Sequence, residues 1–232
     1  MPFSFKQFAI AQSNSAMKVG VDAVILGAWA DIAMSSTVLD VGAGTGILSL
    51  MLAQRNKSVN IYSIEIDKGA FVNLQNNVCQ SPWHDQIHTI NDDFLTHKFP
   101  LKYDCIISNP PFFKASKSNI QQNRKTARIA DVLSPNVLCQ KVNDIINVNG
   151  RFIVIYPFDL RLRFIKAAFA NGFCLYKQLI VSDKKDQKPV RCILCFTTSR
   201  VDKVVQEFIF IKNDDGSYTE DYKLLTEDYY LG

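Results

Sequence analysis

Predicted strands and helices alternate along most of the chain. Apolar runs of about four to eight residues predict strands buried on both faces, and longer segments with apolar residues at helical spacing predict helices between them. The predicted strands are 38–41, 60–64, 87–90, 103–108 and 151–156. The predicted helices are 23–33, 47–54, 68–80, 134–147 and 160–170, the first of them capped by Asp22. Such alternation is typical of a parallel sheet with helices on both faces.

The last part of the chain departs from this alternation. Two apolar runs, 173–181 and 190–197, are separated by the polar stretch 182–189, which predicts an antiparallel hairpin. A final strand at 204–211 precedes a polar tail at 213–232 that contains Tyr218, Tyr222, Tyr229 and Tyr230. The sheet is therefore expected to be mostly parallel, with an antiparallel end.

A glycine-rich turn follows the first buried strand. Its sequence is Asp40-Val41-Gly42-Ala43-Gly44-Thr45-Gly46, and a predicted helix begins at Ile47. The glycines permit a tight turn and a close approach to a ligand, which the helix amides would face. A dinucleotide fingerprint would need its third glycine at position 47. The acid before the first glycine would repel a pyrophosphate, but it suits a ligand with a cationic end such as S-adenosylmethionine.

Acidic residues also follow the next two predicted strands. Glu65 directly follows the strand 60–64, about 20 residues beyond the turn, where such folds place a carboxylate against ribose hydroxyls. Asp93 follows the strand 87–90 and could accept a hydrogen bond from an adenine amino group, with Phe94 stacking nearby. The alternative for Asp93 is a solvated position on a turn.

The most specific chemical signal is Asn109-Pro110-Pro111-Phe112, after the predicted strand 103–108. Two consecutive prolines fix φ and remove two amide donors. The Asn109 side chain and the Pro110 carbonyl can then converge as acceptors, which is what an exocyclic amino group needs. Phe112 offers a flat face to a planar substrate. The alternative is an ordinary Pro-Pro turn.

A basic segment follows this motif. Between Cys105 and Ala130 there is no acid, and the segment carries five basic residues: Lys114, Lys117, Arg124, Lys125 and Arg128. They predict a loop that contacts RNA phosphates beside the acceptor site, the alternative being a solvated loop. A second basic group is the other candidate for RNA contact: Lys184, Lys185, Lys188 and Arg191.

Composition sets broad limits on class. A hydrophobic content of 47% is that of a globular protein with a core, and a net charge of +4 permits an anionic partner without requiring one. The sequence holds no run of about 18 apolar residues and no apolar signal segment, so we expect neither a membrane span nor a secreted protein.

Cysteine usage fits a reducing cytoplasm. Only Cys192 and Cys195 form a C-x-x-C pair, and this pair lies inside a predicted strand. Residues three apart on a strand face opposite sides, so these thiols are expected to be core residues rather than metal ligands. We therefore predict no metal.

With these residues in place, the chain resembles the class I S-adenosylmethionine-dependent methyltransferases. More narrowly, it is similar to the bacterial tRNA1(Val) adenine-N6 methyltransferases, which modify the adenine at position 37 beside the anticodon. The resemblance covers most of the chain. It is carried by these motifs: Phe5-Lys6-Gln7-Phe8, Met17-Lys18-Val19-Gly20, Leu26-Gly27-Ala28-Trp29, Leu50-Met51-Leu52-Ala53-Gln54-Arg55, Gln80-Ser81-Pro82-Trp83, Ile107-Ser108-Asn109-Pro110-Pro111 and Pro189-Val190-Arg191.

The resemblance implies an α/β, Rossmann-like class I methyltransferase fold, with a seven-stranded, mostly parallel sheet, helices on both faces and an antiparallel C-terminal hairpin. It implies a single domain over residues 1–232. In it, 1–35 form an N-terminal lid and first helix, 36–212 the catalytic core, and 213–232 a polar tail. The implied cofactor is S-adenosylmethionine, and the implied partner is the anticodon stem-loop of a valine tRNA. We expect a cytoplasmic monomer.

The resemblance also implies roles for individual residues. The methionine end of the cofactor would be held by the glycine-rich turn, through Asp40, Gly42, Ala43, Gly44 and Gly46. Lys18 and Gly20 would close over it. The nucleoside end would be held by Glu65 at the ribose, and by Ile66, Asp93 and Phe94 around the adenine. The target base would be held by Asn109, Pro110, Pro111 and Phe112. The chain departs from the family pattern at Val21, where threonine is usual, and at Phe112, where tyrosine is frequent.

Three other functions use the same features. Guanine-N2 methylation of ribosomal RNA and N5 methylation of a protein glutamine would both need convergent acceptors like those of Asn109-Pro110. The basic loop favours RNA over protein. A non-catalytic RNA-binding module on the same fold is the third alternative, and the intact Asp40, Glu65 and Asn109 argue against it.

Overall fold

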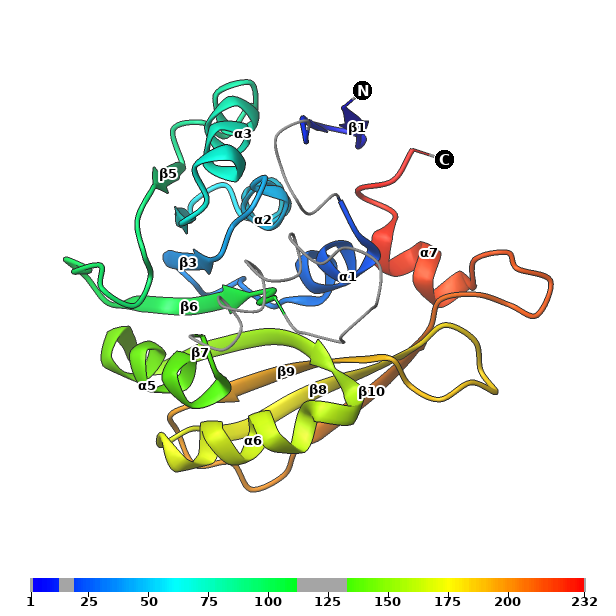
Figure 1. Ribbon diagram of the computed structural model, residues 1–232. Helices are drawn as coiled ribbons and strands as arrows, with labels where there is room; N and C mark the ends of the chain where they lie inside the picture. Colours follow the sequence, from blue (N-terminus) through cyan, green and yellow to red (C-terminus); the bar gives the residue numbers. More distant parts are fainter. Residues whose placement is uncertain (1, 13–18, 112–132, 232) are drawn as a thin grey trace, which may run out of the picture.

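The computed structural model describes residues 2–12, 19–111 and 133–231. Figure 1 shows one central sheet with helices on both faces and with the two chain ends close together. Three of the sequence predictions lie outside the described residues: Lys18, Phe112 and the basic segment from Lys114 to Arg128.

In the part of the chain that the structure describes, the central sheet has eight strands in the order β10-β8-β9-β7-β6-β3-β4-β5. The pairs among β3 to β7 are parallel, β9 is antiparallel to both β7 and β8, and β10 is parallel to β8. The strands are β3 (Thr37–Val41), β4 (Asn60–Ile64), β5 (Ile87–Ile90), β6 (Tyr103–Ser108), β7 (Ile146–Pro157), β8 (Cys174–Ser182), β9 (Arg191–Thr197) and β10 (Val205–Phe210).

This topology confirms the mostly parallel sheet and the antiparallel hairpin of β8 and β9. Within the described residues the sheet has one strand more than the seven that the resemblance implies, because the predicted strand at 204–211 pairs as β10 with the edge at β8. The strand β7 also begins at Ile146, five residues earlier than predicted, directly after a helix that ends at Ile145. Asn149 interrupts this extension with a φ of 62°, a conformation that asparagine tolerates better than most residues.

Helices cover both faces of the sheet. Figure 1 shows one layer of helices above the sheet and another below it. The upper layer consists of α1 (Val21–Trp29), α2 (Ile47–Arg55) and α3 (Lys68–Cys79), and the lower layer of α5 (Pro135–Ile145) and α6 (Arg161–Ala170), the latter preceded by a short 3-10 helix, η1 (Phe158–Leu160). Each layer encloses its own apolar cluster. Cys195 belongs to the first cluster and Cys192 to the second, which confirms that this pair faces opposite sides of β9 as core residues.

The first helix differs from its prediction. Gly20, not Asp22, is the N-cap of α1, and no side chain among the described residues caps this end. The Asp22 side chain instead accepts a hydrogen bond from Arg191 Nε at 2.8 Å. At the other end, Ala30 leaves the helical conformation, so Ile32 reaches the core from a loop. The motif Pro189-Val190-Arg191 is thereby connected to the start of α1.

The C-terminal tail is packed against the rest of the molecule rather than solvated. It forms α7 (Glu220–Thr226), and the side chains of Tyr222 and Tyr229 are almost completely buried. The Tyr229 hydroxyl donates to the carbonyl of Met51 at 3.2 Å, and the Tyr229 carbonyl accepts from the Lys6 amide at 2.8 Å. The tail therefore joins α2 to the N-terminal hairpin of β1 (Phe3–Ser4) and β2 (Ala9–Ile10).

This packing predicts that Tyr229→Ala destabilises the fold by about 3–5 kcal/mol, because it removes a large buried ring and a hydroxyl donor. Leu224→Ala is the matched control on α7. Leu224 is 67% exposed, so its truncation should change the free energy of unfolding by no more than about 0.5 kcal/mol. Urea unfolding monitored by circular dichroism measures both. Equal effects for the two variants would contradict this account of the tail.

Candidate active site

The carboxyl ends of the parallel strands finish in register. Val41 on β3 lies opposite Ile64 on β4 and Ser108 on β6, while Ile64 lies opposite Ile90 on β5. The residues that follow these strand ends are therefore neighbours along one edge, which we call the carboxyl edge. They are Gly42, Glu65, Asn91 and Asn109. The arrowheads of β6 and β7 point towards this edge, from left to right in Figure 1.

The glycine-rich turn is held against the neighbouring strand. The amides of Gly42 and Ala43 both donate to the Ile64 carbonyl, at 3.0 and 3.1 Å. Gly42 and Gly44 have φ values of 70° and 58°, which L side chains rarely adopt. A Cβ built at either glycine would meet no atom of the described residues within 4 Å. The turn therefore leaves room above its backbone for the close approach of a ligand.

Glu65 connects the turn to the next strand end. Its Oε2 accepts from the Gly44 amide at 2.9 Å, and its Oε1 accepts from the Asp67 amide at 2.7 Å. Its carbonyl accepts from Asn91 Nδ2 at 2.7 Å. Burial raises the pKa of the Glu65 carboxyl. Each carboxylate oxygen retains acceptor capacity beyond its one amide bond, so this side chain can also accept hydroxyl donors.

Asp40 lies beneath the turn and is completely buried. Ser49 on α2 donates to Asp40 Oδ2 at 2.7 Å, and the Ser49 hydroxyl also contacts that of Ser63 at 2.7 Å. The other oxygen, Oδ1, accepts no hydrogen bond from the described residues. Burial, together with the negative charge of Glu65, raises the pKa of Asp40 to about 7. A nearby cation would stabilise both carboxylates.

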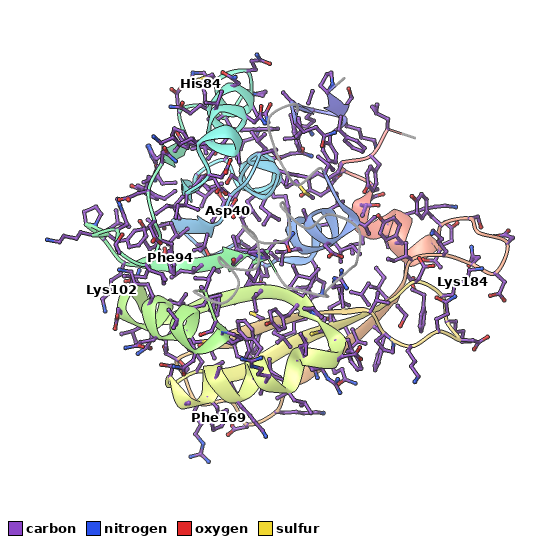
Figure 2. All side chains as sticks on the ribbon, in the orientation of Figure 1. Asp40, His84, Phe94, Lys102, Phe169 and Lys184 are labelled. Carbon is purple, nitrogen blue, oxygen red and sulfur yellow. The ribbon has the colours of Figure 1, made fainter. Side chains whose placement is uncertain are left out.

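Of the other residues predicted to contact the cofactor, some are exposed to solvent and some are buried or bonded within their own turn. Ile66 is 50% exposed beside Glu65, and Gly20 is exposed at the start of α1. Asp93 accepts from the Leu95 amide at 2.9 Å, so part of its acceptor capacity closes its own turn. Phe94 lies in the core with its ring 5.8 Å from that of Phe99, and Figure 2 shows it inside the molecule, as it does Asp40.

Asn109 lies at the carboxyl edge beside the glycine-rich turn. The preceding residue, Ser108, donates through its hydroxyl to the Val41 carbonyl at 2.9 Å, which ties the end of β6 to the end of β3. Asn109 is half-buried, Pro110 is buried and Pro111 is half-buried. The acceptor motif and the glycine-rich turn therefore share one edge, as the sequence predicted.

One buried residue that connects this site to the N-terminal segment was not predicted. Asn77 on α3 donates to the carbonyls of Thr45 at 2.9 Å and Ala11 at 3.0 Å, and it accepts from the Ala11 amide at 2.8 Å. The only sequence signal is its spacing of three from the apolar Leu74, which places it on the buried face of the helix. Because the adjacent Asn76 is exposed and of the same residue type, the sequence alone does not indicate which of the two asparagines is buried.

The described residues form neither a metal cluster nor a membrane-spanning helix. No cluster of three or more His, Cys, Asp or Glu side chains there has the arrangement of a metal site. The helices in this part of the chain are also too short or too polar to cross a membrane.

Known proteins similar to this chain are methyltransferases. Residues 16–135 match the methyltransferase small domain. The fold is similar to that of a predicted O-methyltransferase from Agrobacterium tumefaciens, with a TM-score of 0.69 at 16% identity, over 90% of this chain and 96% of the other. It is also similar to a glycopeptide N-methyltransferase solved with S-adenosylmethionine, with a TM-score of 0.53 at 10% identity, over 72% of this chain and 88% of the other.

Relatives in sequence give a narrower family. The chain is 39% identical over 230 residues to the tRNA1(Val) (adenine(37)-N6)-methyltransferase of Bacteroides thetaiotaomicron, covering 99% of this chain and 97% of that protein. It is 39% identical over 229 residues to the protein of the same name from Aliivibrio fischeri, with the same coverage. On this likeness over nearly its whole length, the chain belongs to the tRNA1(Val) (adenine(37)-N6)-methyltransferase family.

Proposed function

We propose that this chain transfers the methyl group of S-adenosylmethionine to the exocyclic N6 of adenine 37 in tRNA1(Val). The observation that carries the proposal is the register of the strand ends, which brings the glycine-rich turn, Glu65 and Asn109 to one edge of the sheet. The names of the relatives in sequence support the choice of substrate.

The acidic character of the turn fits a cationic cofactor. S-adenosylmethionine would supply an electrophilic methyl group on a sulfonium, and its methionine end would lie over Gly42 and Gly44. Asp40 and Glu65 are both held by hydrogen bonds, and both have raised pKa values that a cation would lower. Glu65 would accept the ribose hydroxyls, and Ile66 would contact the adenine. Gly20, Asp93, Phe94 and Lys18 complete the proposed set.

The acceptor motif would activate the target amine by position. An adenine N6 lone pair is delocalised into the ring, so the amine is a weak nucleophile. Asn109 Oδ1 and the Pro110 carbonyl would accept its two hydrogens, which favours a tetrahedral nitrogen whose lone pair points at the methyl group. The nitrogen–carbon bond would form as the sulfur–carbon bond breaks, and the methylated nitrogen would then lose one proton to solvent. Catalysis is then positioning and electrostatics, with no base needed before attack. Phe112 would stack on the flipped or looped-out base.

The basic segment after this motif would contact the RNA backbone. Its five cations, from Lys114 to Arg128, follow the acceptor motif closely in sequence. Phosphate contacts add affinity and orientation but little sequence information. Base selection would therefore belong to Asn109, Pro110 and Phe112.

The decisive experiment is transfer of a labelled methyl group to unmodified tRNA1(Val), followed by mass spectrometry of the nucleosides. We expect N6-methyladenosine at position 37. If ribosomal RNA gives N2-methylguanosine instead, or a protein gives a methylated glutamine, then that molecule is the substrate and the proposal is wrong. If the protein binds cofactor and RNA but transfers no methyl group, it is an RNA-binding module.

Glu65→Gln should weaken S-adenosylmethionine binding at least about tenfold, because charge-assisted hydrogen bonds to the ribose contribute about 1.5–3 kcal/mol. Glu207→Gln is the matched control: Glu207 is half-buried and bonded to Trp29 and Lys177, on the far edge strand β10. Calorimetry measures the cofactor affinity of both variants, and thermal unfolding confirms that they are folded. An unchanged affinity for Glu65→Gln would remove this residue from the cofactor site.

Cofactor affinity should decrease as the pH is lowered through the pKa of Asp40. The pKa of Asp40 is raised to about 7, so in the free protein a proton competes with a cation below that pH. Binding favours the ionised carboxylate, and we expect affinity about tenfold weaker at pH 5.5 than at pH 7.5. Asp40→Asn should bind more weakly at pH 7.5 and show a flatter pH profile. Calorimetry at both pH values checks this, and parallel profiles for the two proteins would contradict it.

Asn109→Ala removes one acceptor from the target amine and leaves the cofactor pocket intact. Turnover should fall by about a hundredfold or more, by analogy with the loss of one oxyanion-hole donor. Single-turnover methylation of tRNA1(Val) measures the effect, with cofactor affinity as the internal control. Near-normal turnover would refute the proposed mechanism.

A further inference from the structure

A second group of basic residues lies at the carboxyl edge, beyond the acceptor motif. Two come from the first turn of α6 and four from the segment between β8 and the start of β9. They are Arg161, Arg163, Lys184, Lys185, Lys188 and Arg191, and we call them the α6–β9 basic surface. None of them is used in the mechanism above.

Strand pairing places this surface close to the reaction site. Pro157 at the end of β7 pairs with Arg191 at the start of β9, and the Phe158 amide donates to the Val190 carbonyl at 3.3 Å. The strand β9 therefore begins beside the end of β7, three residues beyond the level of Ser108, which pairs with Val154. It is two strands from β6, so strand spacing and rise put its first residue about 12 Å from Asn109. Figure 2 shows Lys184 at the right of the molecule, the direction in which β6 and β7 run in Figure 1.

The charge along the carboxyl edge is divided. On the side of β4 and β5, the strand ends are followed by acids: Glu65, Asp92 and Asp93. On the side of β7 and β9, residues 158–166 carry one acid against three bases, and residues 183–191 carry two acids against four bases. An anionic partner that reaches Asn109 is therefore attracted to the β7 and β9 side and repelled by the other.

Two of these arginines are held in place. The Arg161 guanidinium lies 3.6 Å from the centre of the Phe158 ring and donates to the Phe158 carbonyl at 2.9 Å. A guanidinium has five donors, so Arg161 can also bind a phosphate, and its side chain is already ordered. Arg191 is anchored by Asp22. In contrast, Arg163, Lys185 and Lys188 are exposed.

We infer that the α6–β9 basic surface binds the sugar-phosphate backbone of the RNA stem beside the target nucleotide. The inference rests on the proposed function, in that it assumes an RNA substrate at Asn109. The surface orients the RNA without reading its sequence, because its contacts are with phosphates. Arg161 and Arg191 supply fixed contacts, and the exposed cations extend them over neighbouring phosphates.

The test compares two variants that each remove three positive charges. Arg163→Gln/Lys185→Gln/Lys188→Gln neutralises the exposed part of the surface. Lys57→Gln/Lys102→Gln/Lys203→Gln neutralises three exposed lysines that precede β4, β6 and β10, at the opposite edge of the sheet. Figure 2 shows Lys102 on that opposite side. The affinity for tRNA1(Val) is measured at several salt concentrations.

The surface variant should bind tRNA about tenfold more weakly or worse at low salt. Its plot of log affinity against log salt should be shallower by about two units or more, since each neutralised phosphate contributes about 0.7–0.9. Cofactor affinity should be unchanged, and kcat at saturating tRNA should be largely retained while KM rises. The control variant should stay within about twofold of wild type.

Three outcomes would overturn the inference. One is a surface variant whose salt dependence equals that of wild type, and another is a control variant that loses as much affinity as the surface variant. The third is binding of polyglutamate as tight as tRNA, which would show a general polyanion site. If the wild type methylates no tRNA but the salt dependence changes as expected, the proposed function fails while the RNA contact stands.

Discussion

The carboxylate of Glu65 is the contact on which the geometry of the site depends. By accepting from the Gly44 and Asp67 amides, it joins the glycine-rich turn after β3 to the loop that enters α3. Asp67 in turn caps α3 by accepting from the Gly69 and Ala70 amides at 3.0 Å. The Glu65 side chain thus holds the glycine-rich turn of the proposed cofactor site and, through Asp67, the start of α3.

Burial makes it costly for Asp40 and Glu65 to carry their negative charges together. Asp40 and Glu65 are both buried, and the charge of Glu65 adds to the effect of burial in raising the pKa of Asp40 to about 7. Hydrogen bonds from Ser49, Gly44 and Asp67 offset part of that cost. A site that is electrostatically unsatisfied in the free protein can use its ligand's charge for affinity, because binding relieves the repulsion.

The sequence predicted the parts that follow from local pattern. Apolar runs located the strands of the parallel sheet, and alignment of strand ends then brought Gly42, Glu65 and Asn109 to one edge. Contacts between distant segments were not predictable in this way. Nothing local to Asp22 indicates that it pairs with Arg191 instead of capping α1. Tyr222 and Tyr229 each follow an acidic residue in the sequence, and their burial depends on contacts with distant segments, such as the bond from the Tyr229 hydroxyl to the Met51 carbonyl on α2.

The two chain ends bear on the site through these long-range contacts. The tail holds the N-terminal hairpin by the Lys6 to Tyr229 backbone bond and by stacking of the Phe5 and Tyr230 rings, whose centres are 5.9 Å apart. The hairpin leads to Ala11, which Asn77 ties to Thr45 in the glycine-rich turn. The last residues of the chain therefore help to position the N-terminal segment beside the turn. Because this segment is fixed at both ends, we expect a change in the tail to shift the turn at the proposed cofactor site, although no tail residue lies among the proposed ligands.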